Sequence, residues 1–148
     1  MQTIAGYLGS DHKRCDDIFA AAETSVSSND WDDAAKQLAA FAEALEHHLS
    51  MEEQVLFPEF ESATGMVDGP TRVMRMEHQQ LRSILEVLKD TLAKRDADGF
   101  FGYAETFNTM IQQHNMKEES ILYVMTDNVL AGRRDEVIGA MREVGASA

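Results

Sequence analysis

The sequence predicts an all-α fold, an up-down-up-down antiparallel four-helix bundle followed by room for a short fifth helix. The 148-residue chain has only two prolines, Pro58 and Pro70, and is rich in residues that favour helix over strand. Apolar residues recur every three or four positions in four segments. The connections between these segments are short, which makes neighbouring helices antiparallel. One domain over residues 1–148 is expected from this length.

The first half of the chain predicts two helices, near residues 3–27 and 30–62. Between them lies Ser27-Ser28-Asn29-Asp30, whose polar side chains can cap the start of the second helix. Each helix has one apolar face, formed by Leu8, Cys15, Phe19 and Ala22 in the first and by Phe41, Leu45 and Val55 in the second.

The second half predicts two more helices, near residues 70–95 and 98–127. Gly69-Pro70 places a proline in the first turn of one, and Asp96 to Gly99 separates it from the other. After Gly132, residues 134–144 can add the fifth helix. The apolar faces contain Met74, Leu81, Leu85 and Leu88 in one helix, and Phe107, Ile111, Ile121 and Met125 in the other.

The charge balance excludes whole classes of partner. The formal net charge is −13, from 26 acidic and 13 basic residues. A surface this acidic repels nucleic-acid phosphates and anionic lipids, and no apolar run reaches the roughly 18 residues of a membrane span. The single cysteine, Cys15, forms no internal disulfide, and the N-terminus lacks the pattern of a signal peptide. We therefore expect a cytoplasmic protein without nucleic-acid or membrane partners.

The chain contains an internal repeat. At one constant offset, His12 aligns with His78 and His48 aligns with His114, so four of the five histidines are paired. We predict two related helical hairpins, each with the order His, 35 residues, His, three residues, Glu, arranged about an approximate two-fold axis. The same offset also pairs Glu52 with Glu118, Glu53 with Glu119, Leu56 with Leu122, and Phe57 with Tyr123.

The repeated polar residues lie on the apolar faces of the predicted helices. His48 and Glu52 are four positions apart, as are His114 and Glu118, so each pair shares one helix face. His12 and His78 also fall within apolar stripes. At about 1.5 Å of rise per residue, all six side chains lie at nearly the same depth in the bundle.

These residues predict a buried metal site. Two unpaired carboxylates in an apolar core would cost several kcal/mol each, and no Lys or Arg shares their stripe. Imidazole and carboxylate together suit iron, manganese or zinc, and bundles hold two metals with carboxylates from facing helices. The expected ligands are His12, His48, Glu52, His78, His114 and Glu118.

Other polar residues near this site are expected to have lesser roles. Glu53 and Glu119 each follow a ligand candidate, and we expect them in solvent or hydrogen-bonded to the ligands rather than on the metal. Cys15 lies one turn from His12 and is expected to be a buried structural thiol. Tyr103 and Tyr123 are expected to be packing residues, with a redox or hydrogen-bonding role as the alternative.

With these residues identified, the chain resembles the hemerythrin-like, or HHE cation-binding, family over essentially residues 1–130. The resemblance is closest to the bacterial members with four histidines and two glutamates. It implies a non-haem di-iron centre with an oxo or hydroxo bridge, His12, His48, His78 and His114 as terminal ligands, and Glu52 and Glu118 as bridges. The motifs that carry it are Asp11-His12-Lys13-Arg14-Cys15, His48 to Glu53 with Leu56-Phe57-Pro58, Glu77-His78, and His114 to Glu119 with Leu122-Tyr123.

The sequence departs from the oxygen-carrying hemerythrins in two respects. Those carriers have a fifth histidine, whereas Met74 and Arg82 stand four residues either side of His78. Their last carboxylate also follows its histidine by five positions rather than four. Two more equivalent and more open irons are therefore expected, which disfavours reversible O2 carriage. In the alternative, the vacant position is filled by water, Glu53, Glu119 or Tyr7.

The leading functional hypothesis is a di-iron protein that binds or reacts with O2, nitric oxide or peroxide, in sensing, scavenging or the handling of iron and oxidative stress. A di-iron enzyme of the peroxidase or nitric oxide reductase type is one alternative. Iron-sulfur cluster repair or iron donation is another, although such proteins carry an extra N-terminal cysteine-bearing domain that this sequence does not show. A metal-free interaction bundle is also retained. A ferritin-like oxidase is disfavoured because its Glu-x-x-His motif is absent.

Overall fold

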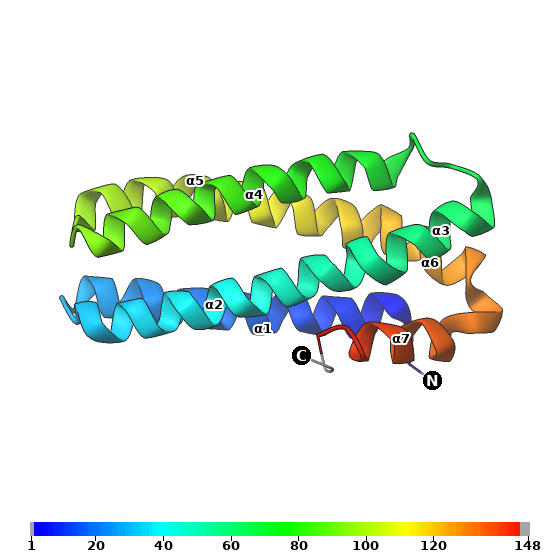
Figure 1. Ribbon diagram of the computed structural model, residues 1–148, viewed down its shortest axis with the longest axis horizontal. Helices are drawn as coiled ribbons and strands as arrows, with labels where there is room; N and C mark the ends of the chain where they lie inside the picture. The colour runs from blue at the N-terminus through cyan, green and yellow to red at the C-terminus, as the bar shows by residue number, and fades with distance from the viewer. Residues whose placement is uncertain (1, 146–148) are drawn as a thin grey trace.

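The computed structural model describes residues 2–145 and, in that range, consists of helices and short connections. The predicted all-α bundle is confirmed (Figure 1). The α-helices are α1 (Ile4–Ser27), α2 (Trp31–Met51), α3 (Phe57–Thr64), α4 (Pro70–Ala93), α5 (Ala97–Lys117), α6 (Tyr123–Val129) and α7 (Arg134–Arg142). Two π-helical turns, η1 (Glu52–Leu56) and η2 (Glu118–Leu122), and a 3-10 turn, η3 (Ala131–Arg133), complete the list.

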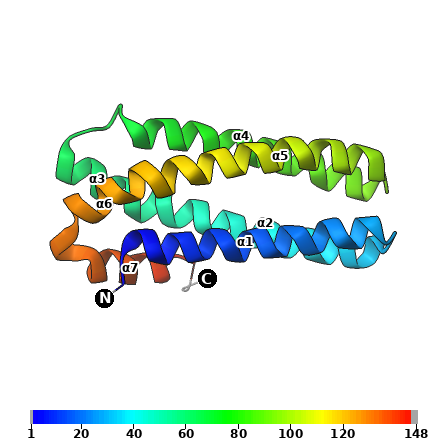
Figure 2. The ribbon, with the colours of Figure 1, turned by 180° about the vertical axis from the view of Figure 1, so that it is seen from behind.

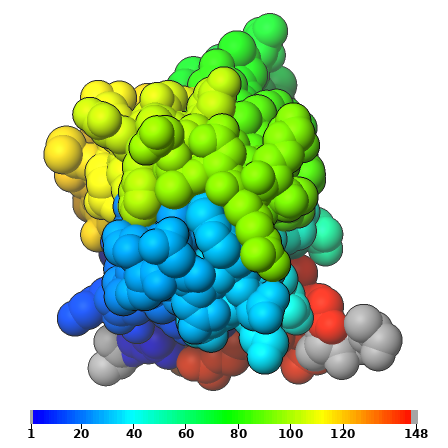
Figure 3. All heavy atoms as spheres, turned by 90° about the vertical axis from the view of Figure 1, so that its left-hand side faces the viewer, coloured from blue at the N-terminus to red at the C-terminus, as the bar shows by residue number. Residues whose placement is uncertain are grey.

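The bundle is built from two helical hairpins. Helices α1 and α2 form one hairpin and α4 and α5 form the other, and their tight turns lie at the same end of the molecule (Figures 1 and 2). Helices α3 and α6 extend the bundle at the opposite end, where α7 folds back beside α1. The expected fifth helix is confirmed over Arg134–Arg142. In a space-filling view of the end that carries the two hairpin turns, the atoms of the two hairpins cover this end of the bundle (Figure 3).

The two hairpin turns are conformational copies of each other, as the sequence repeat predicts. Asn29 and Arg95 occupy equivalent positions and both have a positive φ, 56° and 52°. The next residue in each turn is an aspartate that caps the following helix: Asp30 accepts a hydrogen bond from the amide of Asp33, and Asp96 accepts one from the amide of Gly99. In each hairpin, the capping hydrogen bond begins the second helix directly after the tight turn, and the two helices run antiparallel.

The two π-turns change which residues face the core. A π-turn contains about one residue more than an α-turn, so the inward face shifts along the sequence. Leu56 and Leu122 are fully buried, whereas Val55 is only half-buried and Ile121 is 56% exposed. The expectation that Ile121 belongs to the buried stripe is therefore wrong, because it assumed an uninterrupted α-helical period.

The apolar core is divided into two clusters with the polar residues between them. The cluster nearest the hairpin turns contains Phe19, Phe41, Phe100 and Phe107, with the Phe19 and Phe41 rings 4.8 Å apart. The cluster at the other end is formed by α1, the π-turns and α7. In the described part of the chain, no helix has both the length and the apolar character needed to cross a membrane.

The register set by η2 is testable with a matched pair of substitutions. Leu122→Ala removes a buried side chain and should lower the free energy of unfolding by about 2–5 kcal/mol. Ile121→Ala, one position earlier, removes a largely exposed side chain and should change it by less than about 0.5 kcal/mol. Urea denaturation of the metal-free proteins measures both values. Equal losses in the two variants would contradict the π-turn register.

Candidate metal centre

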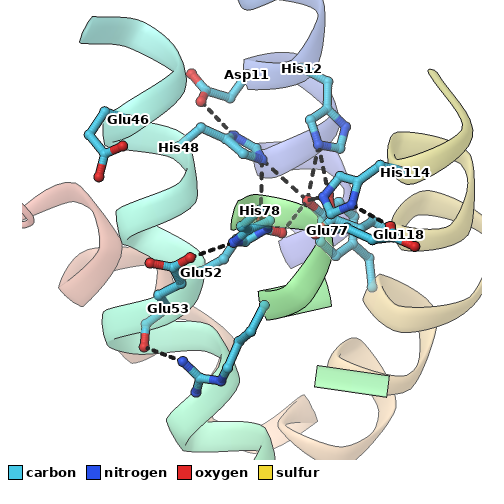
Figure 4. A network of polar contacts seen from close by, with 12 residues as sticks. Asp11, His12, Glu46, His48, Glu52, Glu53, Glu77, His78, His114 and Glu118 are labelled. Atoms are coloured by element: carbon cyan, nitrogen blue, oxygen red, sulfur yellow. Dashed lines mark hydrogen bonds and ion pairs between the residues drawn. The ribbon is translucent and has the colours of Figure 1, made fainter. Parts of the chain in front are cut away.

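The structure brings all six predicted ligand residues together in the middle of the bundle. His12 lies on α1, His78 on α4, and the other two histidines lie near the ends of α2 and α5. The two glutamates occupy the first positions of η1 and η2, and both are 0% exposed. Labelled side chains from the four helices point toward one another (Figure 4). The cluster expected from the repeat is therefore present.

The cluster contains two subsites, each with a pair of facing imidazoles. In the His12–His48 subsite, the ring centroids are 4.5 Å apart and His12 Nε2 lies 3.1 Å from Glu118 Oε1. In the His78–His114 subsite, the centroids are 5.0 Å apart. Here His78 Nε2 lies 3.2 Å from Glu52 Oε1, and His114 Nε2 lies 3.2 Å from Glu118 Oε1. Glu52 Oε1 also lies 3.6 Å from His48 Nε2, so each carboxylate contacts both subsites.

Several of these buried atoms make no hydrogen bond of acceptable geometry among the described residues, although a nitrogen and an oxygen lie as close as 3.2 Å. They are Glu52 Oε1, Glu118 Oε2, His78 Nε2 and His114 Nε2. Buried polar atoms are normally hydrogen-bonded, so unpartnered ones need an explanation. These four are imidazole nitrogens and carboxylate oxygens, which are good ligands for transition metals. Donor atoms of Glu52, His78, His114 and Glu118 all lie within 4.8 Å of one another. The residues present therefore fit a metal cation.

Each histidine is oriented by a second carboxylate on its other ring nitrogen. An Nδ1–H donor bonded to a carboxylate leaves Nε2 free to face a metal and makes it more basic. All four contacts are 2.7–2.8 Å long: His12 with Glu119, His48 with Asp11, His78 with Glu53, and His114 with Glu77. Glu53 and Glu119 are thus hydrogen-bonded to histidines of the cluster, which agrees with the first of the two sequence expectations for these residues.

Asp11 and Glu77 belong to the quoted motifs, but the sequence analysis did not assign them their contacts with His48 and His114. The internal repeat could have indicated their role, because each of them directly precedes a histidine that the repeat pairs. Although burial opposes ionisation, the hydrogen bond and charge of His48 lower the pKa of Asp11 to about 2. The hydrogen bonds of Glu53 with His78 and Arg82 likewise outweigh burial and lower its pKa to about 2. These outer carboxylates remain ionised at neutral pH.

The inner residues show the electrostatic cost of the arrangement without metal. Burial and the nearby charge of Glu118 raise the pKa of Glu52. Burial lowers the pKa of His12 and His78, but hydrogen bonds and the negative charges of Glu52 and Glu118 outweigh it and raise both pKa values to about 9. Protons therefore supply the counter-charge in the metal-free protein. A bound metal must displace them from the imidazole nitrogens.

Tyr123 packs in the core, as expected, and also has the hydrogen bonds of the alternative expectation. It is fully buried, and its hydroxyl donates to Glu52 Oε2 at 2.7 Å and lies 3.0 Å from Glu118 Oε1. Its contacts therefore include the ligand cluster as well as the core. Tyr103, expected to pack, is 47% exposed, and that expectation is wrong. Tyr7 contacts Met51 Sδ and does not fill a coordination position.

A small apolar cavity adjoins the cluster on the side of the hairpin turns. Its volume is about 10 Å³, which is close to the space needed by one water molecule. Cys15 lies on its wall and is buried, as expected, and burial raises the pKa of its thiol to about 12. The rest of the lining contains three histidines of the cluster, six apolar side chains and three other polar side chains, namely His12, His48 and His114, then Phe19, Phe41, Leu45, Leu49, Phe107 and Ile111, and then Asp16, Asn108 and Asn115.

The orienting carboxylates can be tested with a charge-matched pair. Asp11→Asn keeps the size of the side chain but removes the charge that holds His48 Nδ1, and it should weaken metal binding by about 10–100-fold. Asp17→Asn removes one charge from an exposed position on the same helix and should have no such effect. Anaerobic competition with a chromophoric chelator gives the two affinities. Similar affinities in both variants would contradict an orienting role.

The comparisons with known proteins agree with this site. Residues 3–126 match the sequence model described as the hemerythrin HHE cation binding domain. The chain is also similar to the iron-sulfur cluster repair protein YtfE of Cronobacter sakazakii, with 41% identity over 58 residues, 38% of this chain and 26% of that protein. The YtfE protein of Escherichia coli O1:K1 / APEC is 40% identical over 57 residues, again 38% of this chain and 26% of the relative.

The matched segment thus spans about a quarter of each of these relatives. No solved structure gave a significant match. The family match covers both hairpins and all six clustered residues. This chain belongs to the hemerythrin HHE cation-binding family and is a metal-binding four-helix bundle.

Proposed function

We propose that this protein holds two iron ions, one in each subsite, and binds or reacts with O2, nitric oxide or peroxide. His12 and His48 would hold one ion, and His78 and His114 the other. Glu52 and Glu118 would bridge the two ions, since both contact both subsites. Each ion would then have two imidazole and two carboxylate donors, which suits iron and is also compatible with manganese or zinc.

The observation that carries the choice of ligand is the cavity beside the histidines. It measures about 10 Å³ and its wall is mostly apolar, so it fits a molecule of two or three atoms. An organic substrate is far too large for this space. O2 and nitric oxide are uncharged diatomic molecules, and they would gain from contact with the apolar side chains that make up most of this wall.

The chain's own residues would prepare the centre for such a ligand. The outer carboxylates fix the imidazole rings, and the phenylalanines of the cavity keep bulk water away from the reactive side. Bound iron would supply the coordination position and the electrons. Four protein donors per ion would leave positions open for the small molecule.

Binding and catalysis are separate outcomes of this proposal. A sensor or scavenger reacts with about one equivalent of ligand per centre, whereas a peroxidase or nitric oxide reductase consumes many equivalents when given a reductant. Peroxide or nitric oxide consumption by the iron-loaded protein, with an artificial electron donor present, distinguishes the two. Sustained consumption, abolished in the same protein stripped of iron, would make it an enzyme.

A second candidate function is iron-sulfur cluster repair, which is favoured by the names of the YtfE relatives. In that case the partner would be an iron-sulfur protein and the iron would be cargo or cofactor. The test is reactivation of an iron-sulfur dehydratase whose cluster has been damaged by nitric oxide. Reactivation that depends on the iron-loaded protein, beyond the effect of equal free ferrous iron, would favour repair over ligand binding.

The bridging role of Glu52 predicts a particular order of metal loss. Glu52→Ala removes a donor from both subsites, so iron content should fall from about two ions per chain to well below one. His114→Ala removes a donor from one subsite and should leave about one ion. Plasma emission spectrometry of anaerobically loaded protein measures both. Near-full occupancy in Glu52→Ala would contradict bridging.

The absence of a fifth histidine predicts the behaviour toward O2. The reduced protein should be oxidised by air and should not return to the reduced form under argon, because open irons allow further reaction. Its visible spectrum is followed through repeated argon and air cycles without added reductant. A band that appears in air and disappears under argon over many cycles would instead indicate reversible carriage.

A further inference from the structure

The two halves of the repeat differ at one position that contacts the metal cluster. Phe57 and Tyr123 occupy equivalent places, each directly after a π-turn and five residues after a clustered glutamate. Phe57 stacks against His78 with ring centroids 5.6 Å apart, and Tyr123 stacks against His12 at 5.7 Å. The two aromatic rings therefore pack alike. The second half of the repeat differs from the first by the hydroxyl group of Tyr123.

The Tyr123 hydroxyl is surrounded by donor atoms of the His12–His48 subsite. Its oxygen lies 3.2 Å from His12 Nε2 and 3.5 Å from His48 Nε2. The same oxygen lies 2.7 Å from Glu52 Oε2 and 3.0 Å from Glu118 Oε1. Packing alone does not explain this placement, because Phe57 provides the same ring contact without burying a polar atom.

These separations match the spacing of ligands around one ion. Two donors that are each about 2.1 Å from a metal and at right angles to each other lie about 3 Å apart. The four distances from Tyr123 Oη bracket that value. No equivalent oxygen exists in the His78–His114 subsite at this repeat position, because Phe57 has none.

We propose that Tyr123 Oη is a fifth protein ligand to the metal held by His12 and His48, so that the two metals of the centre are inequivalent. This inference rests on the proposed di-iron function and deepens it. On binding ferric iron, the O–H bond of Tyr123 breaks, an Oη–Fe bond forms and the proton is released to solvent. The oxidation state of the iron does not change in this step.

The position of Tyr123 leaves the small-molecule cavity open. Tyr123 packs in the apolar cluster that includes α7, whereas the cavity is lined by the cluster near the hairpin turns. Tyr123 is not among the residues that line the cavity, so the phenol would hold the ion without entering the cavity. The iron held by His12 and His48 would then have five protein donors and the other iron four. This differs from the more equivalent pair of irons that we expected from the missing fifth histidine.

A tyrosine bound to ferric iron has a spectroscopic signature that does not depend on activity. Iron-loaded, oxidised protein is examined by resonance Raman spectroscopy with excitation in the visible charge-transfer band. We expect tyrosinate ring modes that shift when the protein is produced with ring-deuterated tyrosine. Tyr123→Phe should lose these modes while it keeps about two irons. Tyr7→Phe, which changes another tyrosine outside the cluster, should keep them.

A gain-of-function variant covers the case in which Tyr123→Phe folds poorly. Phe57→Tyr places a second phenol at the equivalent position and should add tyrosinate intensity. Mössbauer spectroscopy should resolve two iron environments of equal area in the wild-type protein and more similar ones in Phe57→Tyr. Wild-type protein with two irons but no tyrosinate modes overturns this inference alone. Wild-type protein that binds no iron overturns both the inference and the proposed function.

Discussion

The rest of the structure depends on the burial of two carboxylates, Glu52 and Glu118, at the centre of a helical bundle. Both are 0% exposed, and an isolated buried charge is too costly to retain without compensation. The compensation here comes from imidazoles, which accept either a proton or a metal. A second layer of carboxylates then holds the imidazoles. The charge of the inner carboxylates is thus compensated by the imidazoles, and the imidazoles are in turn hydrogen-bonded to the outer carboxylates.

The internal repeat provides this arrangement twice, and its departures from symmetry make the two subsites chemically different. Arg82 forms a bidentate contact with Glu53, the carboxylate that holds His78. At the equivalent position of the other half the residue is Asp16, and Glu119 is 47% exposed. The charge beyond the orienting carboxylate is therefore positive near His78 and negative near His12. The Phe57 and Tyr123 pair adds a second difference on the inner side.

Much of the fold and site could be predicted from the sequence because their signals are periodic. Helix boundaries follow from apolar spacing and capping residues, and the clustered residues follow from the repeat. The π-turns could not be predicted in this way, because their sequences, Glu52–Leu56 and Glu118–Leu122, contain no residue type that distinguishes them from an α-turn. The resulting shift placed Ile121 on the wrong face.

The surroundings of the predicted ligands were harder to obtain from sequence. Asp11 and Glu77 resemble ordinary surface acids, since nothing in helical spacing shows that they cross to a histidine on the neighbouring helix. Tyr123 aligns with a phenylalanine, so its pattern is that of a core residue. Only the distances from its hydroxyl to four clustered side chains show its polar role.

The proposed centre holds two irons, each between one pair of histidines. Anomalous X-ray diffraction at the iron absorption edge, from crystals of the iron-loaded protein, tests it most directly. We expect two anomalous peaks per chain, one between His12 and His48 and one between His78 and His114, with Glu52 and Glu118 between them. A single peak, or peaks elsewhere on the acidic surface, would contradict it.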